Sequence, residues 1–248
     1  MKIYSILLLA LIAATSVLSD KDSQPPKNFR ALVFSKTLLY RHASITNGIA
    51  AIKKLGEENQ FSVDATEDSA AFTPENLAKY KVVVFLSTSG DVLNDAQQTA
   101  FQKFIEDGGG FVGIHAAAFG GSATETHWPW YGELLCASFT KHSAILPADV
   151  VIEDRQNISM QHLPPRWNHT DEWYNFTATP RPKVHVLASV DETTYHGGTM
   201  EKDHPVVWCK NMGKGRAWYT ALGHTDACYV EPFFLKHLLG GIQFVAGN

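Results

Sequence analysis

Three of the eleven histidines stand where an apolar run of the sequence stops: His42, His115 and His224. An imidazole in such a place can act as a general base, a hydrogen-bond donor or a metal ligand, because its pKa lies near neutrality. The alternative is a ring that is satisfied by neighbouring backbone groups and does no chemistry. For His115, the spacing alone leaves the two interpretations balanced.

His115 has the most informative neighbours, because it is the centre of the stretch Gly-Ile-His-Ala-Ala at 113–117. Small residues around one functional side chain, at a turn from a strand into a helix, are typical of the sharp turn that presents a nucleophile. In this sequence the central residue is a histidine, where a hydrolase would have a serine or a cysteine.

A second candidate is the stretch 167–176, in which an acidic pair stands among aromatic residues: Asp171, Glu172, Trp173 and Tyr174. Carboxylates bind hydroxyl groups, and aromatic faces stack on the apolar side of a sugar ring, so this composition suits a saccharide. The alternative is a structural aromatic cluster with solvated acids. Core packing is favoured for the aromatic stretch 128–132, and surface or capping roles are favoured for His142 and His204.

Motifs of fixed spacing for metal or phosphate chemistry are absent from the sequence, since it contains no HExxH, no CxxC and no P-loop. A serine-hydrolase GxSxG turn is absent as well. A divalent metal ion would therefore depend on residues far apart in the chain, namely His42, His115 and His224, with Glu172 as a carboxylate partner.

The first half of the chain predicts alternating strands and helices. Strands are expected at 29–35, 61–66, 81–87 and 110–115, and helices at 45–59, 74–80 and 94–107. This alternation predicts a parallel sheet with right-handed crossovers. Ligands bind at the carboxyl ends of such strands, where the segments 36–44, 87–91, 115–117 and 223–226 are expected to converge.

The second half of the chain is less regular. A helix is expected at 128–137, strands at 149–153, 184–190, 206–210 and 216–222, a hairpin turn at 211–215 and a closing helix at 231–246. No linker divides the sequence, so we expect a single domain at 29–247.

The first 19 residues have the pattern of a secretory signal peptide. Lys2 precedes an apolar run that is shorter than the about 20 residues of a membrane span. We expect cleavage near Ser19, a polar tether at 20–28, and a chain that is secreted, or periplasmic in a bacterium, without a membrane anchor. The alternative is an uncleaved N-terminal anchor.

Charge and composition restrict the partners. The formal net charge is −4 and no basic cluster occurs, which argues against a nucleic-acid or anionic-membrane partner. The cysteines allow one disulfide or three buried thiols: Cys136, Cys209 and Cys228. Three sequons would accept glycans in a eukaryotic host: Asn157, Asn168 and Asn175. The oligomeric state is not indicated.

Several stretches together resemble the ThuA-like (trehalose utilisation) family. They are FSKT at 34–37 with RH at 41–42, VFLSTSGD at 84–91, GGGFVGIHAA at 108–117, WPWYG at 128–132, DEWYNF at 171–176 and GRAWYTALGHT at 215–225. The resemblance implies a flavodoxin-like α/β fold related to class I glutamine amidotransferases. Such a fold has a mostly parallel central sheet, helices on both faces and, here, an antiparallel extension in the second half.

The resemblance also implies what the chain does not do. Amidotransferases of that superfamily have a cysteine at the sharp turn and a histidine after the last strand. In this sequence His115 and His224 stand at those places, and Cys136 is about 20 residues further on. A thioester mechanism needs the missing nucleophile, so glutaminase activity is not expected.

We therefore expect a small, sugar-like ligand in a crevice at the carboxyl ends of the strands. In an enzyme, the catalytic residues would be His115, His224 and Glu172. A non-catalytic sugar-binding or interaction module is the alternative. Further contacts to the ligand are expected from Arg41, His42, Thr88, Gly90, Asp91, Asp171, Trp173 and Tyr174.

Overall fold

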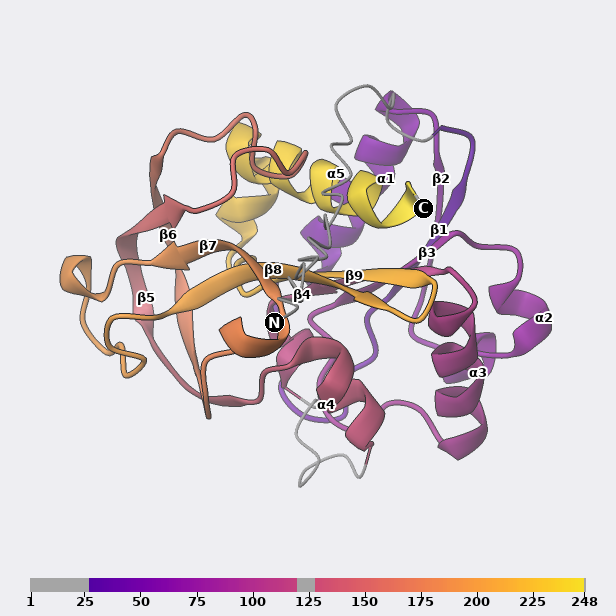
Figure 1. Ribbon diagram of the computed structural model, residues 1–248. Helices are drawn as coiled ribbons and strands as arrows, with labels where there is room; N and C mark the ends of the chain where they lie inside the picture. Colours follow the sequence, from indigo (N-terminus) through magenta and orange to yellow (C-terminus); the bar gives the residue numbers. More distant parts are fainter. Residues whose placement is uncertain (1–26, 120–127, 248) are drawn as a thin grey trace, which may run out of the picture.

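The computed structural model describes residues 27–119 and 128–247. Within these residues, nine strands form one mixed sheet with helices on both faces (Figure 1), in the order β2-β1-β3-β4-β9-β8-β7-β5-β6. The predicted signal peptide at 1–19 and residues 20–26 of the predicted tether lie outside the described residues. No helix in the described part of the chain is long and apolar enough to cross a membrane.

The first half of the sheet is parallel, as predicted. Its strands are β1 (Arg30–Phe34), β2 (Ser62–Thr66), β3 (Val82–Leu86), β4 (Gly110–Ile114) and the later β9 (Gly215–Thr220), which pairs in parallel with β4. Every residue of β3 and β4 is buried, which is typical of parallel strands that are covered on both faces.

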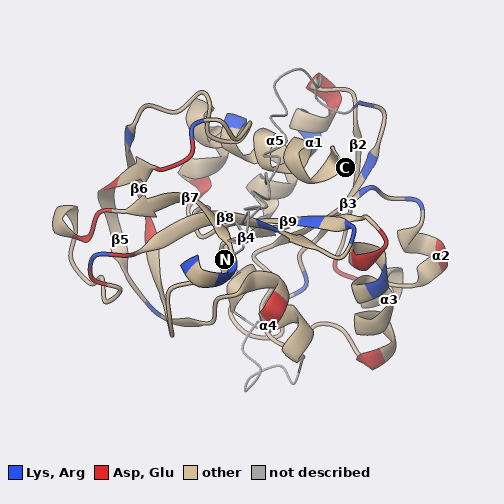
Figure 2. Ribbon diagram, viewed as in Figure 1, with Lys and Arg blue, Asp and Glu red and all other residues tan. Residues whose placement is uncertain are grey.

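The helices cover the two faces in different groups. Helices α1 (Ile45–Glu58) and α5 (Pro232–Ala246) lie together on one face (Figure 1). Helices α3 (Asp95–Glu106) and α4 (Pro129–Leu135) lie on the other face, and the short α2 (Pro74–Leu77) packs on α3. Basic and acidic residues are both distributed over the helices and strands of the ribbon (Figure 2).

The second half of the sheet is antiparallel and differs from the sequence prediction in two strands. Its strands are β5 (Phe139–Ile152), β6 (Arg166–Phe176), β7 (His185–Val190) and β8 (Pro205–Met212). β5 begins ten residues earlier than predicted, and β6 was not predicted because its mixed acidic and aromatic composition does not resemble a strand. The predicted turn between β8 and β9 is confirmed, since Met212 pairs with Gly215.

The sheet curls so that its last strand returns to the parallel half. β6 stands four places from β9 in the strand order, yet Asp171 of β6 accepts a hydrogen bond from the backbone N–H of Gly223, just after β9. Register shifts in β5 lie between Phe139 and Lys141 and between His142 and Ile145. Such irregularities bend and twist a strand pair, and the bent pair extends over the carboxyl ends of the parallel strands.

The cysteines are unpaired: Cys136, Cys209 and Cys228 are all free. The sequence left open one disulfide or three buried thiols. The structure shows three unpaired thiols, of which Cys209 and Cys228 are buried and Cys136 is partly exposed. The domain is held instead by a continuous apolar core that includes both halves of the sheet.

Helix α3 begins at a capping box, as its sequence predicts. The Asn94 side chain accepts from the backbone N–H of Gln97 at 3.1 Å, and the Gln97 side chain accepts from the backbone N–H of Asn94 at 2.9 Å. The two bonds satisfy N–H groups that have no partner within the helix.

We expect Asn94→Ala to lower the free energy of unfolding by about 1 kcal/mol, because it removes the cap of this helix. Urea denaturation of the purified protein measures the change. Thr99→Ala, an exposed change in the same helix, is the control and should leave stability unchanged or slightly higher. An equal loss in both variants would contradict the role of the cap.

Candidate functional site

Three histidines and one glutamate meet at the carboxyl ends of the parallel strands. His42 comes from the loop after β1, His115 directly follows β4, His224 follows β9, and Glu172 comes from β6. The ring centroid of His42 lies 4.7 Å from that of His115 and 5.0 Å from that of His224. The structure thus brings together the three histidines that the sequence placed at strand ends.

His115 occupies a strained backbone position. It begins the 3₁₀ helix η2 (His115–Ala118) with φ of +49°, a left-handed conformation that costs a non-glycine residue about 1–2 kcal/mol. The strand that leads into the turn is closely packed, since a Cβ at Gly113 would lie only 3.0 Å from the Tyr219 ring. This geometry matches the sharp turn expected from the small residues around His115.

The orientation of the His115 ring is fixed by the backbone. Its Nδ1 lies 2.7 Å from the carbonyl oxygen of Ala221, which can only accept, so Nδ1 carries the proton. In the neutral ring, Nε2 therefore has a free lone pair that is directed at Glu172 and His224. A histidine that donates one nitrogen to a carbonyl and offers the other is typical of a metal ligand.

Glu172 is the charged centre of the group. Its Oε2 lies 3.5 Å from His115 Nε2 and 3.1 Å from His224 Nδ1. Burial alone would raise the pKa of Glu172, but its interactions with the imidazoles of His115 and His224, which favour the ionised carboxylate, hold this pKa well below its usual range. Glu172 also raises the pKa of His224 against the opposing effect of burial.

His42 is enclosed and lacks a polar partner at one nitrogen. Only 4% of the residue is exposed, and its Nδ1 has no hydrogen bond within the described part of the chain. Burial, together with the neighbouring His115 and His224, lowers the pKa of His42 to about 3. A neutral imidazole with an unused buried nitrogen is costly unless something binds it.

The donor set and its spacing fit a tetrahedral divalent ion. Atoms that bind Zn²⁺ at about 2.0–2.1 Å in a tetrahedron lie about 3.3–3.4 Å from one another. Here His115 Nε2 and His224 Nδ1 are 3.1 Å apart, and each lies 3.1–3.5 Å from Glu172 Oε2. A nitrogen of His42 lies within 4.8 Å of the other ligand atoms. These four residues could therefore hold a metal.

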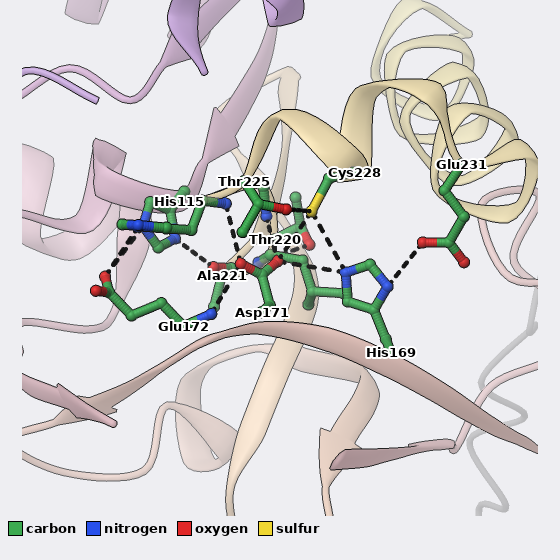
Figure 3. A network of polar contacts seen from close by, with 12 residues as sticks. His115, His169, Asp171, Glu172, Thr220, Ala221, Thr225, Cys228 and Glu231 are labelled. Atoms are coloured by element: carbon green, nitrogen blue, oxygen red, sulfur yellow. Dashed lines mark hydrogen bonds and ion pairs between the residues drawn. The ribbon is translucent and has the colours of Figure 1, made fainter. Parts of the chain in front are cut away.

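A second buried network, which includes Asp171, His169 and Glu231, adjoins this group (Figure 3). The Asp171 carboxylate accepts the backbone N–H groups of Gly223 at 2.7 Å and His224 at 3.0 Å. His169 lies between two carboxylates, with Nε2 3.3 Å from Asp171 and Nδ1 2.8 Å from Glu231. Burial alone would lower the pKa of His169. The hydrogen bonds of its ring with Asp171, Cys228 and Glu231 outweigh burial and raise this pKa to about 11.

Four of the predicted ligand contacts lie apart from the histidines. Arg41 is exposed and forms an ion pair with Glu67 at 2.7 Å. Thr88, Gly90 and Asp91 line a small separate pocket with Trp128 and Tyr131, and Asp91 accepts a hydrogen bond from Gln98. These positions lie near the strand ends, but within the described residues their side chains form no recorded hydrogen bond or ion pair with the His–Glu group, the name used here for His42, His115, His224 and Glu172.

The aromatic residues of β6 divide between the two sides of the strand, as alternation requires. Tyr174 lies on the same side as Glu172, with its ring centroid 4.1 Å from that of His115. Trp173 is buried on the other side, where its Nε1 donates to the carbonyl oxygen of Leu146. Trp173 and Asp171, both predicted to contact substrate, instead contact protein atoms.

The three sequons differ in accessibility. Asn168 is exposed and donates to Asp149, and the half-buried Asn157 accepts from Ser159. Asn175 is wholly enclosed, since its amide bonds to Gly197 and Thr199. A glycan on Asn175 is incompatible with this fold, whereas glycosylation at Asn157 and Asn168 stays a prediction.

Two residues at the site were not identified from the sequence. His142, which is 48% exposed, places its Nδ1 3.0 Å from Glu172 Oε1. The ring of Tyr40, whose residue is 62% exposed, lies 4.7 Å from that of His42. For His142 the missing signal was the strand itself, because β5 pairs His142 with Tyr174 and so places both on the side of Glu172. Tyr40 has no signal beyond its position two residues before His42.

His169 should make the stability of the protein depend on pH. Its pKa is raised to about 11 in the folded chain, against an ordinary value near 6.5. The stabilisation is therefore complete below about pH 6.5 and is lost as the pH rises toward 11. We expect His169→Gln to destabilise the protein by about 1–3 kcal/mol at pH 6, and the difference from wild type to narrow toward pH 10. Urea denaturation across this range measures it, and a constant difference would contradict the assignment.

Comparisons with known proteins agree with this architecture. The sequence matches the family model ThuA, described as trehalose utilisation, over residues 30–245. A crystal structure of a ThuA-like protein from Bacteroides uniformis ATCC 8492 is similar with a TM-score of 0.76 and 27% identity, covering 91% of this chain and 94% of that one.

More distant structures share the fold. A ThuA-like protein from Parabacteroides merdae ATCC 43184 aligns with a TM-score of 0.73 and 20% identity, over 89% of this chain and 91% of that one. A cytoplasmic protein of Salmonella typhimurium LT2 aligns with a TM-score of 0.64 and 11% identity, over 87% and 99%. No curated protein matches the sequence. Because the family model matches nearly all of the described chain, this protein belongs to the ThuA (trehalose utilisation) family.

Proposed function

We propose that this ThuA-family chain binds a divalent metal ion with His42, His115, His224 and Glu172, and acts there on a sugar or sugar derivative. The observation that carries the metal is the spacing of three ligand atoms, 3.1 to 3.5 Å apart, at a buried site. The sugar is supported by the description of the family and by the aromatic residues beside the site.

The residues around the ligand atoms suggest how such a site would work. A bound divalent ion would polarise a carbonyl or hydroxyl oxygen of the substrate. His142, half exposed at the edge and 3.0 Å from Glu172, is placed to exchange a proton with a substrate oxygen. Tyr174 covers one face of His115 and excludes water from it.

Other features of the chain stay proposals of the same kind. Export through the N-terminal signal, a sugar-like small-molecule partner and the absence of a nucleic-acid partner rest on the sequence. A flavodoxin-like relationship to class I amidotransferases is supported by the parallel strand order β2-β1-β3-β4. A glutaminase role is not proposed, because His115 stands where that chemistry needs a cysteine.

We expect His115→Ala to weaken the binding of Co²⁺ at least 100-fold, because it removes one ligand and leaves the others in place. Titration with Co²⁺, followed by visible absorption, reports both affinity and a tetrahedral environment. His185→Ala, which removes an exposed histidine paired with Asp154, is the matched control and should bind Co²⁺ like wild type. Wild-type-like binding by the His115 variant would overturn the metal site.

The sugar assignment needs a separate measurement. Metal-loaded protein is incubated with trehalose and a panel of other disaccharides, with binding followed by calorimetry and products by NMR. Product formation that His115→Ala abolishes supports an enzyme. Binding without product supports the non-catalytic sugar-binding module, and failure to bind any member of the panel contradicts the sugar assignment in both forms.

Tyr40 should contribute to saccharide binding through stacking. Its exposed ring stands beside the His–Glu group on a backbone held by Ser89, whose hydroxyl donates to the Tyr40 carbonyl at 2.9 Å. We expect Tyr40→Ala to weaken the binding of the saccharide by about 0.5–1.5 kcal/mol, and Tyr40→Phe to retain the affinity of the wild type. Val230→Ala, at another exposed apolar residue, is the control. Calorimetry measures the difference, and equal affinities for Tyr40→Ala and wild type would refute it.

A further inference from the structure

One buried carboxylate connects the two segments that carry Glu172 and His224. Asp171 is fully enclosed, and its two oxygens accept three backbone N–H groups. The donors are Glu172 at 2.9 Å, Gly223 at 2.7 Å and His224 at 3.0 Å. Hydrogen bonds to an ionised acceptor are stronger than neutral ones, so this carboxylate fixes the backbone on both sides of the site.

The segment held by Asp171 has little other support for these N–H groups. Gly223 and His224 lie between β9 and the 3₁₀ helix η5 (Asp226–Val230), outside any regular element. Gly223 has φ of +113°, which turns the chain sharply at this point. Without Asp171, the Gly223 N–H would be buried without a partner, at a cost that backbone rearrangement would relieve.

The Asp171 side chain is itself held in place by a contact with His169. His169 lies 3.3 Å from one of its oxygens, and Glu231, at the start of α5, binds the other nitrogen of His169 at 2.8 Å. Glu231 in turn accepts from Trp167 Nε1 at 3.0 Å. The row Glu231, His169 and Asp171 thus extends from the end of η5 to the four residues of the metal site (Figure 3).

We infer that Asp171 is a positioning residue for the metal site, setting the backbone that places His224 and Glu172, and that His169 anchors it. The inference rests on the proposed metal site. It also gives the acidic pair two different roles, since Glu172 offers its carboxylate to the site while Asp171 offers its carboxylate to the backbone. Asp171 has no exposed atom with which to contact a substrate.

The role predicts a specific response to Asp171→Asn. An asparagine presents an NH₂ group where one carboxylate oxygen accepted, so it faces a backbone N–H with another donor. We expect Co²⁺ affinity to fall about 10–100-fold, the usual loss for a group that orients metal ligands, with an altered absorption spectrum. Thermal unfolding is measured in parallel to show that the variant remains folded.

Cys228→Ser is the matched control for this variant. Cys228 contacts both Asp171, at 3.5 Å, and His169, at 3.6 Å, but bonds to neither His224 nor Glu172. We expect its Co²⁺ affinity to stay within about 3-fold of wild type. His169→Gln leaves Asp171 in place but removes the imidazole that holds it. We expect its loss of Co²⁺ affinity to lie between those of Asp171→Asn and Cys228→Ser.

The outcomes separate this inference from the proposed function. Wild-type Co²⁺ affinity in a folded Asp171→Asn protein overturns the positioning role and leaves the metal site intact. A wild-type chain that binds no Co²⁺ overturns both. If Asp171→Asn does not fold, amide hydrogen exchange in the unmodified protein tests the positioning role instead. Slow exchange of the Gly223 and His224 amides supports that role, and exchange as fast as in an open loop overturns it.

Discussion

The architecture of the site depends on one interaction, the acceptance of backbone N–H groups by the buried carboxylate of Asp171. This contact joins β6, at one edge of the sheet, to the loop after β9 near its centre. It closes the curl of the sheet, because strands four places apart meet only if the antiparallel half bends over. The curl in turn brings Glu172 to histidines that the parallel half provides.

The parallel half of the fold could be predicted well from the sequence, for a physical reason. β3 and β4 are covered on both faces, so they appear as unbroken apolar runs. The capping box of α3 is equally local, since it needs only Asn94 and Gln97. β6 could not be recognised in this way, because nearly all of its inward positions hold polar or aromatic side chains whose partners lie far away in the sequence.

The same contrast explains which site residues could be predicted. His42, His115 and His224 follow from a general property of parallel sheets, whose carboxyl ends lie at one edge. The different roles of Asp171 and Glu172 could not be predicted, because they depend on the two residues being neighbours in one strand. Alternation then directs one carboxylate to the imidazoles and the other to the backbone. Tyr40 and His142 depend on loop and bulge geometry, which no local pattern encodes.

The left-handed backbone at His115 has a consequence for any attempt to engineer this protein. Glycine or asparagine would fit φ of +49° with less strain than histidine. A redesign that selects residues for backbone conformation alone would therefore favour one of these two residues at position 115, and would remove the imidazole at the centre of the site. The left-handed conformation at this turn therefore has to be retained together with the imidazole that it presents to the site.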